Sequence, residues 1–367
     1  MTGNRRLWPA AMVSLAVLAL VAIAALPAEH WETDFLSFYA GARLAGSGAL
    51  YSVRAVQAIE APLERHPEEV RAYIRPPFYA ALSWPLGKLP YRTALVIWQL
   101  VNVAALGRFI WLWSPRAFSF PLCCFCFPVW MSLVLGQDMP FFLLLTATAV
   151  YLLARHRDFA AGVVIAFCGV KFHLFLLLPV VIVARRMWRF GFGLAAGGAA
   201  LLAASFAVGG WEWPRQYYEL VRLNERYQAS QSYMPNLNGL FHAAPHAAVW
   251  IGLCSAAVVG ATWWAARRAS PAAAVAIMLC GGVVISPHAF LYDLGLLLPF
   301  LLDEDRTPGR ALMLSAVAGA AALALTVPAV AFLGQLAIAG LFGAAVWETR
   351  AARDGLGVTA APAWEMG

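Results

Sequence analysis

The chain has 367 residues, of which 62% are hydrophobic and only 12% are charged, and its mean hydropathy is +0.70. Roughly a quarter of the residues of a soluble domain are charged, so this composition excludes a soluble monomer and predicts an integral membrane protein. The net charge of +7 comes from 24 arginines and two lysines set against 19 acidic residues. The arginines lie in short clusters between apolar runs, a pattern that orients membrane proteins, and no nucleic-acid partner is expected.

The first apolar run extends from Leu7 to Leu26 and follows the pair Arg5-Arg6. Its length is close to the ~20 residues that a membrane-spanning helix needs. The run is too long for the apolar region of a typical signal peptide, and no small-residue cleavage site follows it. We therefore expect a retained first helix with its N-terminus in the cytoplasm.

A polar stretch, residues 28–75, comes next and is predicted to be the first external loop. Thr33 is a suitable N-cap residue, and Phe35, Tyr39 and Ala42 recur at helical spacing after it. This pattern predicts a short amphipathic helix that lies in the membrane interface.

Asp34 would occupy the first turn of that helix, where the helix dipole favours an ionised carboxylate. An ionised carboxylate is what a general base needs in order to accept a proton. An acidic residue that only stabilises a helix start fits the same pattern, so the local sequence leaves both interpretations open.

The remaining apolar runs predict a polytopic helical protein. Residues 77–135 are broken near 87–90 and near 114–116, so some of the pieces are expected to be short or re-entrant. Later runs are 139–154, 159–184, 190–209, 247–266, 271–285, 289–302, 311–327 and 329–346. Together they predict an all-α membrane protein with roughly 11–13 membrane segments, several of them shorter than a perpendicular span. Residues 1–350 are predicted to form a single membrane domain, and residues 351–367 a cytoplasmic tail.

The arginine clusters predict which loops share a side of the membrane. Clusters assigned to the cytoplasm are Arg155/Arg157, Arg185/Arg186/Arg189, Arg267/Arg268, Arg306/Arg310 and Arg350/Arg353. The elements left for the opposite side are residues 29–75, 136–138, 171–173, the external loop 210–246 and 286–293. We therefore expect an inner-membrane protein with both termini in the cytoplasm and a polar site on the periplasmic or external side.

The six cysteines all fall inside apolar segments, so structural disulfides are not expected. No pair of histidines or acidic residues shows the close helical spacing of metal ligands. The sequence therefore predicts no metal site.

Lys171 and His173 interrupt an apolar run, and charged groups at membrane depth are costly unless they have a partner. One interpretation is that they bind an anion, such as a phosphate in the headgroup region. The alternative is a salt bridge to an acid within the membrane, with Asp138 and Asp293 as the candidates.

Two further polar segments carry candidate residues. His288 and Asp293 flank a bend at Pro287, and either a binding role or a structural role fits His288. Asn236 and Asn238 close the loop 210–246, which also carries aromatic residues. Such a mixture suits sugar hydroxyls and ring faces, although an asparagine-rich turn before a helix needs no ligand.

Six motifs follow one another along the chain in an order that resembles glycosyltransferase family 87. They are Asp34-Phe35-x-x-Phe38-Tyr39, Arg75-Pro76-Pro77-Phe78, Gly136-Gln137, Val170-Lys171-Phe172-His173, Met234-Pro235-Asn236-Leu237-Asn238-Gly239, and Ser286-Pro287-His288 with Tyr292-Asp293. The resemblance extends over roughly residues 7–302. It implies a GT-C-type fold and a membrane enzyme that transfers a sugar, with mannose as the expected one, from a polyprenyl-phosphate donor to a lipid or glycan acceptor.

The resemblance also implies an inverting reaction at the outer face of the membrane, with no metal and no cofactor besides the lipid-linked donor. Asp34 occupies the position of the general base, and Glu32 lies close enough to compete for that role. Lys171 is the first candidate to bind the donor phosphate, followed by His173, His288 and Arg75. The residues expected to contact the sugar or the acceptor are Glu32, Tyr39, Gln137, Asn236, Asn238, Tyr292 and Asp293.

A function from another class fits the same polar residues. A secondary transporter or lipid flippase would have a polar site lined by Lys171, His173 and His288. Transporters of this kind are often built from paired internal repeats, and the two halves of the chain show no self-similarity. A noncatalytic membrane subunit with the same fold is a third possibility, and the presence of Asp34 beside the other polar elements argues against it.

Overall fold

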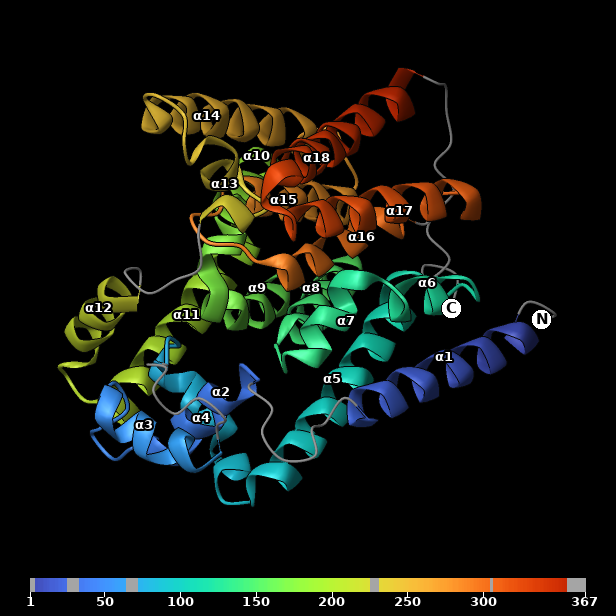
Figure 1. The fold of residues 1–367 in the computed structure, drawn as a ribbon. Helices are drawn as coiled ribbons and strands as arrows, with labels where there is room; N and C mark the ends of the chain where they lie inside the picture. The colour runs from blue at the N-terminus through green and yellow to red at the C-terminus, as the bar shows by residue number, and fades with distance from the viewer. Residues whose placement is uncertain (1–3, 25–32, 64–71, 225–230, 304–305, 355–367) are drawn as a thin grey trace.

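A computed structural model describes residues 4–24, 33–63, 72–224, 231–303 and 306–354. In these ranges the chain forms α-helices and short 3-10 helices and contains no strand (Figure 1). The predicted all-α class is confirmed.

Among the residues that the structure describes, six stretches of helix are long and apolar enough to cross a membrane. They are α5 (Tyr91–Trp113), α11 (Trp188–Gly209), α14 (Ala247–Ala266), α17 (Pro308–Leu325), α9 (Asp158–Ala166) continued by η2 (Phe167–Phe175), and η5 (Pro328–Val330) continued by α18 (Ala331–Asp354). The protein is therefore a polytopic membrane protein.

α1 (Asn4–Ala24) has 21 residues, with an apolar stretch at Trp8–Leu20. The remaining apolar helices are shorter, namely α6 (Ser119–Cys124), α7 (Phe127–Val134), α8 (Met139–Ala154), α10 (Leu178–Arg185), α15 (Pro271–Ile285), η4 (Leu291–Leu297) and α16 (Leu298–Leu301). The roughly 11–13 segments expected from the sequence thus include several that do not reach the ~20 residues of a perpendicular span.

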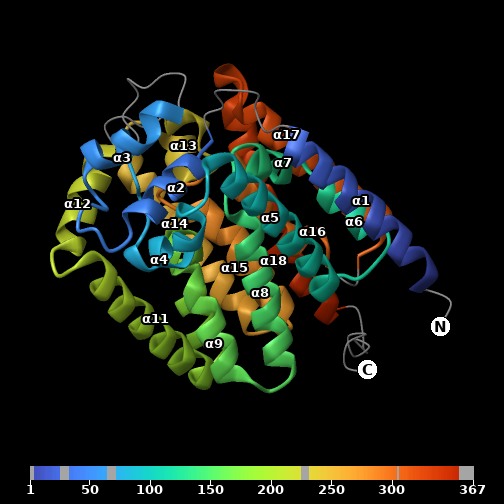
Figure 2. The same ribbon diagram turned by 90° about the horizontal axis from the view of Figure 1, so that it is seen from below.

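Helices that pack closely form the apolar body of the molecule. α9 and α11 lie side by side, and α17 lies along α18 (Figures 1 and 2). Gly193 of α11 permits the first contact, because a Cβ at this position would lie 2.0 Å from the backbone oxygen of Phe159. Small residues commonly allow this kind of approach between helices in membranes, where van der Waals packing replaces the hydrophobic effect.

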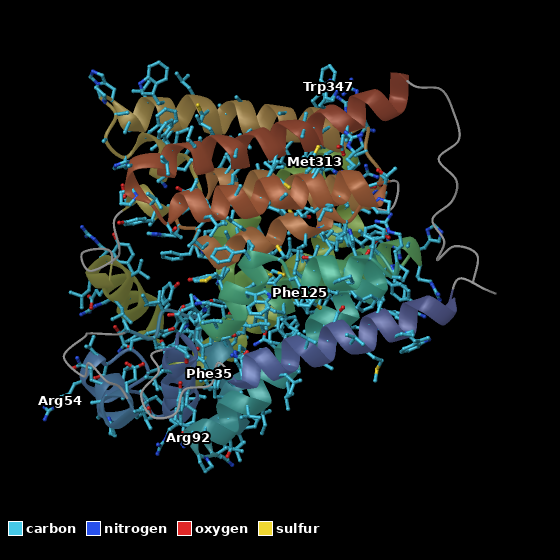
Figure 3. All side chains as sticks on the ribbon, turned by 45° about the vertical axis from the view of Figure 1, so that its right-hand side comes forward. Phe35, Arg54, Arg92, Phe125, Met313 and Trp347 are labelled. Atoms are coloured by element: carbon cyan, nitrogen blue, oxygen red, sulfur yellow. The ribbon has the colours of Figure 1, made fainter. Side chains whose placement is uncertain are left out.

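A second group of helices gathers at one end of the body. It comprises α2 (Phe35–Leu44), α3 (Val53–Glu60), η1 (Ala61–Leu63), α4 (Pro77–Gly87) and α12 (Trp213–Asn224). The short helices η3 (Gln231–Tyr233) and α13 (Leu237–Phe241) pack instead against α18, and α13 also packs against α14. Leu220 of α12 is buried in one apolar cluster with Val56 of α3, and the rings of Tyr217 and Tyr51 are 5.8 Å apart. The two predicted external loops therefore pack against each other. Figure 3 shows Arg54 at this end of the molecule and Trp347 at the opposite end.

The start of α2 differs from the prediction. Thr33 is not the N-cap residue, because its hydroxyl is 2.9 Å from the hydroxyl of Tyr91 and Asp34 occupies the cap position instead. Seven of the ten residues of α2, Phe35, Leu36, Phe38, Tyr39, Ala40, Gly41 and Ala42, are buried. α2 therefore lies beneath its neighbours, α4 in particular, and does not present one broad face to its surroundings.

Candidate functional site

A buried network of polar side chains lies where several distant segments of the chain meet. Its members are Asp34 at the start of α2, Arg75 before α4, Gln137 and Asp138 between α7 and α8, Lys171 in η2 and Asp293 in η4. Segments that the sequence assigned to one side of the membrane are thus brought together.

Lys171 lies at the centre of the network. Its Nζ donates to Asp293 Oδ1 at 2.9 Å and to Gln137 Oε1 at 3.1 Å, and it lies 3.4 Å from Asp138 Oδ1. The same nitrogen is 4.6 Å from the centre of the Tyr292 ring. The backbone of Lys171 leaves helical geometry, with φ −122° and ψ 51°, so η2 is kinked at this residue. Both salt bridges that the sequence offered as the alternative to anion binding are present.

Asp138 lies between two cations. Its Oδ2 accepts a 2.9 Å hydrogen bond from the hydroxyl of Tyr79 and lies 3.7 Å from Arg75 Nε, while its Oδ1 faces Lys171. Burial raises the pKa of the Asp138 carboxyl, but the charges of Lys171 and Arg75 and the Tyr79 hydrogen bond outweigh it and lower the pKa below its usual value. The carboxylate is therefore ionised at neutral pH.

Asp34 lies at the edge of the network and is partly exposed. Its Oδ2 accepts a 2.6 Å hydrogen bond from Gln137 Nε2, and its backbone N–H donates to the carbonyl oxygen of Leu135. This carboxylate is held in place by its neighbours and is accessible from outside, so a substrate hydroxyl can come within hydrogen-bond reach of it, as general-base catalysis requires.

The turn before α8 presents Gln137 and Asp138 to the network. Gly136 adopts a φ of +67°, a left-handed conformation that favours glycine, and its carbonyl oxygen accepts a 2.8 Å hydrogen bond from Trp98 Nε1. Gln99 Nε2 also donates to the carbonyl oxygen of Leu133 just before this turn. α5 therefore holds the turn through two successive side chains.

The two histidines lie on segments that also carry residues of the network. His173 follows Lys171 by two residues in η2, and the centre of its ring is 5.8 Å from that of Phe172. The carbonyl oxygen of His288 accepts a short hydrogen bond from the hydroxyl of Ser286. His173 is thus on the same segment as Lys171, and His288 precedes Asp293 by five residues.

The two asparagines bind another part of the backbone. Asn236 caps α13 by accepting from the backbone N–H of Gly239 and donates to the carbonyl oxygen of Ser286 at 2.9 Å. Asn238 donates to the carbonyl oxygen of Pro287 at 3.0 Å. Both side chains therefore hold the segment that carries His288, and they bond neither Asp34 nor Lys171 in the described part of the chain.

Two predicted contact residues remain. The hydroxyl of Tyr39 donates to the carbonyl oxygen of Leu89 at 2.8 Å, and its buried ring packs against Tyr91. Glu32 lies outside the described residues. Tyr79 was not predicted, although it directly follows the motif Arg75-Pro76-Pro77-Phe78.

No group of three or more metal-binding side chains occurs in the ranges that the structure describes, and all six cysteines there are free. A cavity of about 20 Å³ lies between α8, α9, α10, α11 and α15. Its lining is almost entirely apolar and includes none of the predicted site residues, so the polar network is the candidate site. Leu153 and Arg185 both line this cavity, so the C-terminal ends of α8 and α10 lie near each other.

A model of glycosyltransferase family 87 matches residues 73–292 of the chain. Neither the curated proteins nor the solved structures include a significant match. The matched range contains Arg75, Gln137 and Lys171, begins after Asp34 and ends at the residue before Asp293.

Proposed function

Because the chain belongs to glycosyltransferase family 87, we propose that this membrane glycosyltransferase takes its sugar from a polyprenyl-phosphate donor and uses Asp34 as the general base. The observation that carries the proposal is the partly exposed Asp34 carboxylate, fixed at 2.6 Å by Gln137 beside a buried cluster that contains two cations. The acceptor is a lipid or a glycan, and the sugar is mannose.

In the proposed reaction, Asp34 accepts the proton of the acceptor hydroxyl while the hydroxyl oxygen attacks the anomeric carbon of the donor sugar. The bond between this carbon and the phosphate oxygen breaks, and the polyprenyl phosphate leaves with the electron pair. Attack opposite the leaving group inverts the anomeric configuration. A cation beside the phosphate stabilises the charge that develops on it.

The charge arrangement supports a reaction without a metal ion. Lys171 lies between the carboxylates of Asp138 and Asp293, where its ammonium group occupies the position that a metal ion bound by these two carboxylates would take. We therefore expect transfer to proceed equally well in the presence of EDTA. A loss of transfer that added Mg²⁺ or Mn²⁺ restores would contradict this part of the proposal.

The membrane setting completes the proposal. The enzyme resides in the cell inner membrane with both termini in the cytoplasm, and the site opens to the periplasmic or external side. The basic loops support this orientation, because Arg185 donates to the carbonyl oxygens of Ala266 and Ala269, so two of the arginine-rich loops lie at the same end of their helices. Labelling of single cysteines introduced at Arg54 and at Arg157 with an impermeant reagent in intact cells tests it, and only the first should react.

The central experiment uses purified protein in nanodiscs with radiolabelled polyprenyl-phosphate mannose and extracted membrane lipids as acceptors. Asp34→Asn keeps the size of the side chain, so we expect normal thermal stability and a loss of transfer by a factor of about 10²–10⁴. Asp158→Asn, at the start of α9 and outside the network, is the matched control and should retain wild-type transfer.

Equal transfer by the wild type and Asp34→Asn would eliminate Asp34 as the base. Solute or lipid movement across liposomes, with no consumption of any polyprenyl-linked sugar, would favour the transporter or flippase interpretation instead.

A further inference from the structure

The ammonium group of Lys171 is already surrounded by acceptors. Two of its hydrogen bonds go to Asp293 and Gln137, and the carboxylate of Asp138 lies 3.4 Å away. The side chain is only 4% exposed. A phosphate that approached Lys171 would meet two carboxylates, so like charges would repel it.

Arg75 is more exposed than Lys171, and its guanidinium group has fewer acceptors around it. Its side chain is 15% exposed, its Nη1 donates to the carbonyl oxygen of Ile74, and its Nε lies 3.7 Å from Asp138. In the described part of the chain, its Nη2 makes no hydrogen bond. A guanidinium group carries five N–H donors in a planar fork that fits a phosphate, so Arg75 has donors to spare.

The side-chain amide of Gln137 can bridge Lys171 and Asp34 in one orientation only. Its carbonyl oxygen accepts from Lys171, and its amide nitrogen therefore faces Asp34, to which it donates. The reverse orientation would place the amide hydrogens against the ammonium and the carbonyl oxygen against the carboxylate. Lys171 thus fixes which end of Gln137 faces Asp34.

We propose that Lys171 is a positioning residue that orients Asp34 through Gln137, and that Arg75 binds the phosphate of the donor. This division of roles rests on the function proposed above and reverses the order of the phosphate candidates expected from the sequence. It predicts that the two cations affect different kinetic constants.

Removing Lys171 alone would leave the buried carboxylates of Asp138 and Asp293 with too little positive charge beside them, which destabilises the fold. The double variant Lys171→Met/Asp293→Asn removes one charge of each sign, and the asparagine oxygen can still accept from the backbone N–H of Phe290. Gln137→Leu interrupts the same connection without changing any charge. Thermal unfolding in detergent verifies that each variant is folded.

We expect Gln137→Leu and the double variant each to lower kcat about tenfold or more, with donor KM within about twofold of the wild type. The triple variant Gln137→Leu/Lys171→Met/Asp293→Asn should lower kcat by no more than the larger of these two effects. All three substitutions interrupt the same connection, which runs from Lys171 through Gln137 to Asp34. A raised donor KM with unchanged kcat in the double variant, or fully additive losses, would overturn the positioning role.

Arg75→Lys keeps the positive charge beside Asp138 but removes the fork. We expect it to raise donor KM about tenfold or more, since hydrogen bonds to charged groups are among the strong ones. The matched control is Arg54→Lys, an exposed arginine of α3, which should leave donor KM unchanged. An unchanged KM in Arg75→Lys would remove Arg75 from the phosphate site.

Binding of polyprenyl phosphate without a sugar, followed by its effect on thermal unfolding, separates this inference from the proposed reaction. Arg75→Lys should bind it about tenfold more weakly than the wild type, and Lys171→Met/Asp293→Asn should bind it as the wild type does. Weaker binding by the double variant alone would overturn the assignment. Absence of transfer by the wild type, with this binding pattern intact, would count against the proposed reaction and not against the assignment.

Discussion

Gly136 lies directly against Phe35, so that a Cβ added to Gly136 would be 2.7 Å from the Cβ of Phe35. Phe35 follows Asp34 in the chain, and Gly136 precedes Gln137. This backbone contact therefore sets the distance across which Gln137 donates to Asp34, and the absence of a side chain at position 136 is part of the site.

Gly136→Ala should damage both stability and transfer. The residue has a φ of +67°, which costs an L-residue about 1–2 kcal/mol, and the new methyl group would also push Phe35 away. We expect thermal unfolding at a lower temperature and transfer reduced at least tenfold, since the Asp34–Gln137 distance would grow. Gly260→Ala in α14 is the control, because a Cβ there meets nothing within 4 Å. Wild-type transfer by Gly136→Ala would show that this contact is dispensable.

Asn236→Ala should act mainly on stability. The substitution removes the cap of α13 and the hydrogen bond to Ser286, for a combined loss of about 2 kcal/mol. Asn238→Ala removes only the hydrogen bond to Pro287 and should cost about 1 kcal/mol or less. Chemical unfolding in detergent measures both. A large rise in acceptor or donor KM in either variant, with stability unchanged, would instead assign that asparagine to substrate binding.

Replacing Glu348 should lower the stability of the protein more than replacing Arg310, the exposed arginine that it contacts. Its carboxylate lies 2.5 Å from Arg306, whose side chain is 3% exposed, and 2.8 Å from Arg310, whose side chain is 56% exposed. Glu348→Ala would leave the buried Arg306 charge without this partner, at a cost of about 3–5 kcal/mol. Arg310→Ala should cost less than about 1 kcal/mol, as expected for an exposed ion pair. Equal losses in the two variants, measured by chemical unfolding, would contradict this ranking.

Helix boundaries could be predicted where proline and glycine interrupt the apolar runs. α4 ends at Gly87 and α5 at Trp113, as expected from the breaks near 87–90 and 114–116. The cap of α2 could not be predicted, because Thr33 bonds Tyr91, a residue of another helix. Long-range contacts of this kind override local capping preference.

The site could be predicted as a set of residues but not as an arrangement. The sequence left open whether Lys171 binds an anion or forms a salt bridge, since its partners Asp138 and Asp293 are far away in the chain. Similarly, Gln137 and Asp34 are separated by 103 positions, and no local pattern indicates that they touch. The role of Tyr79 could not be predicted, because packing of the ring is usually sufficient to account for an aromatic residue in an apolar helix.

The order of the charged residues along the chain bears on how the protein enters the membrane as it is made. An unaccompanied ammonium group is costly at membrane depth, and Asp293 follows Lys171 only after 122 further residues have been synthesised. Asp138 and Arg75 precede Lys171, and Asp138 contacts both. A counterion has thus already been synthesised when Lys171 is added to the chain, and Asp293 completes the charge balance 122 positions later.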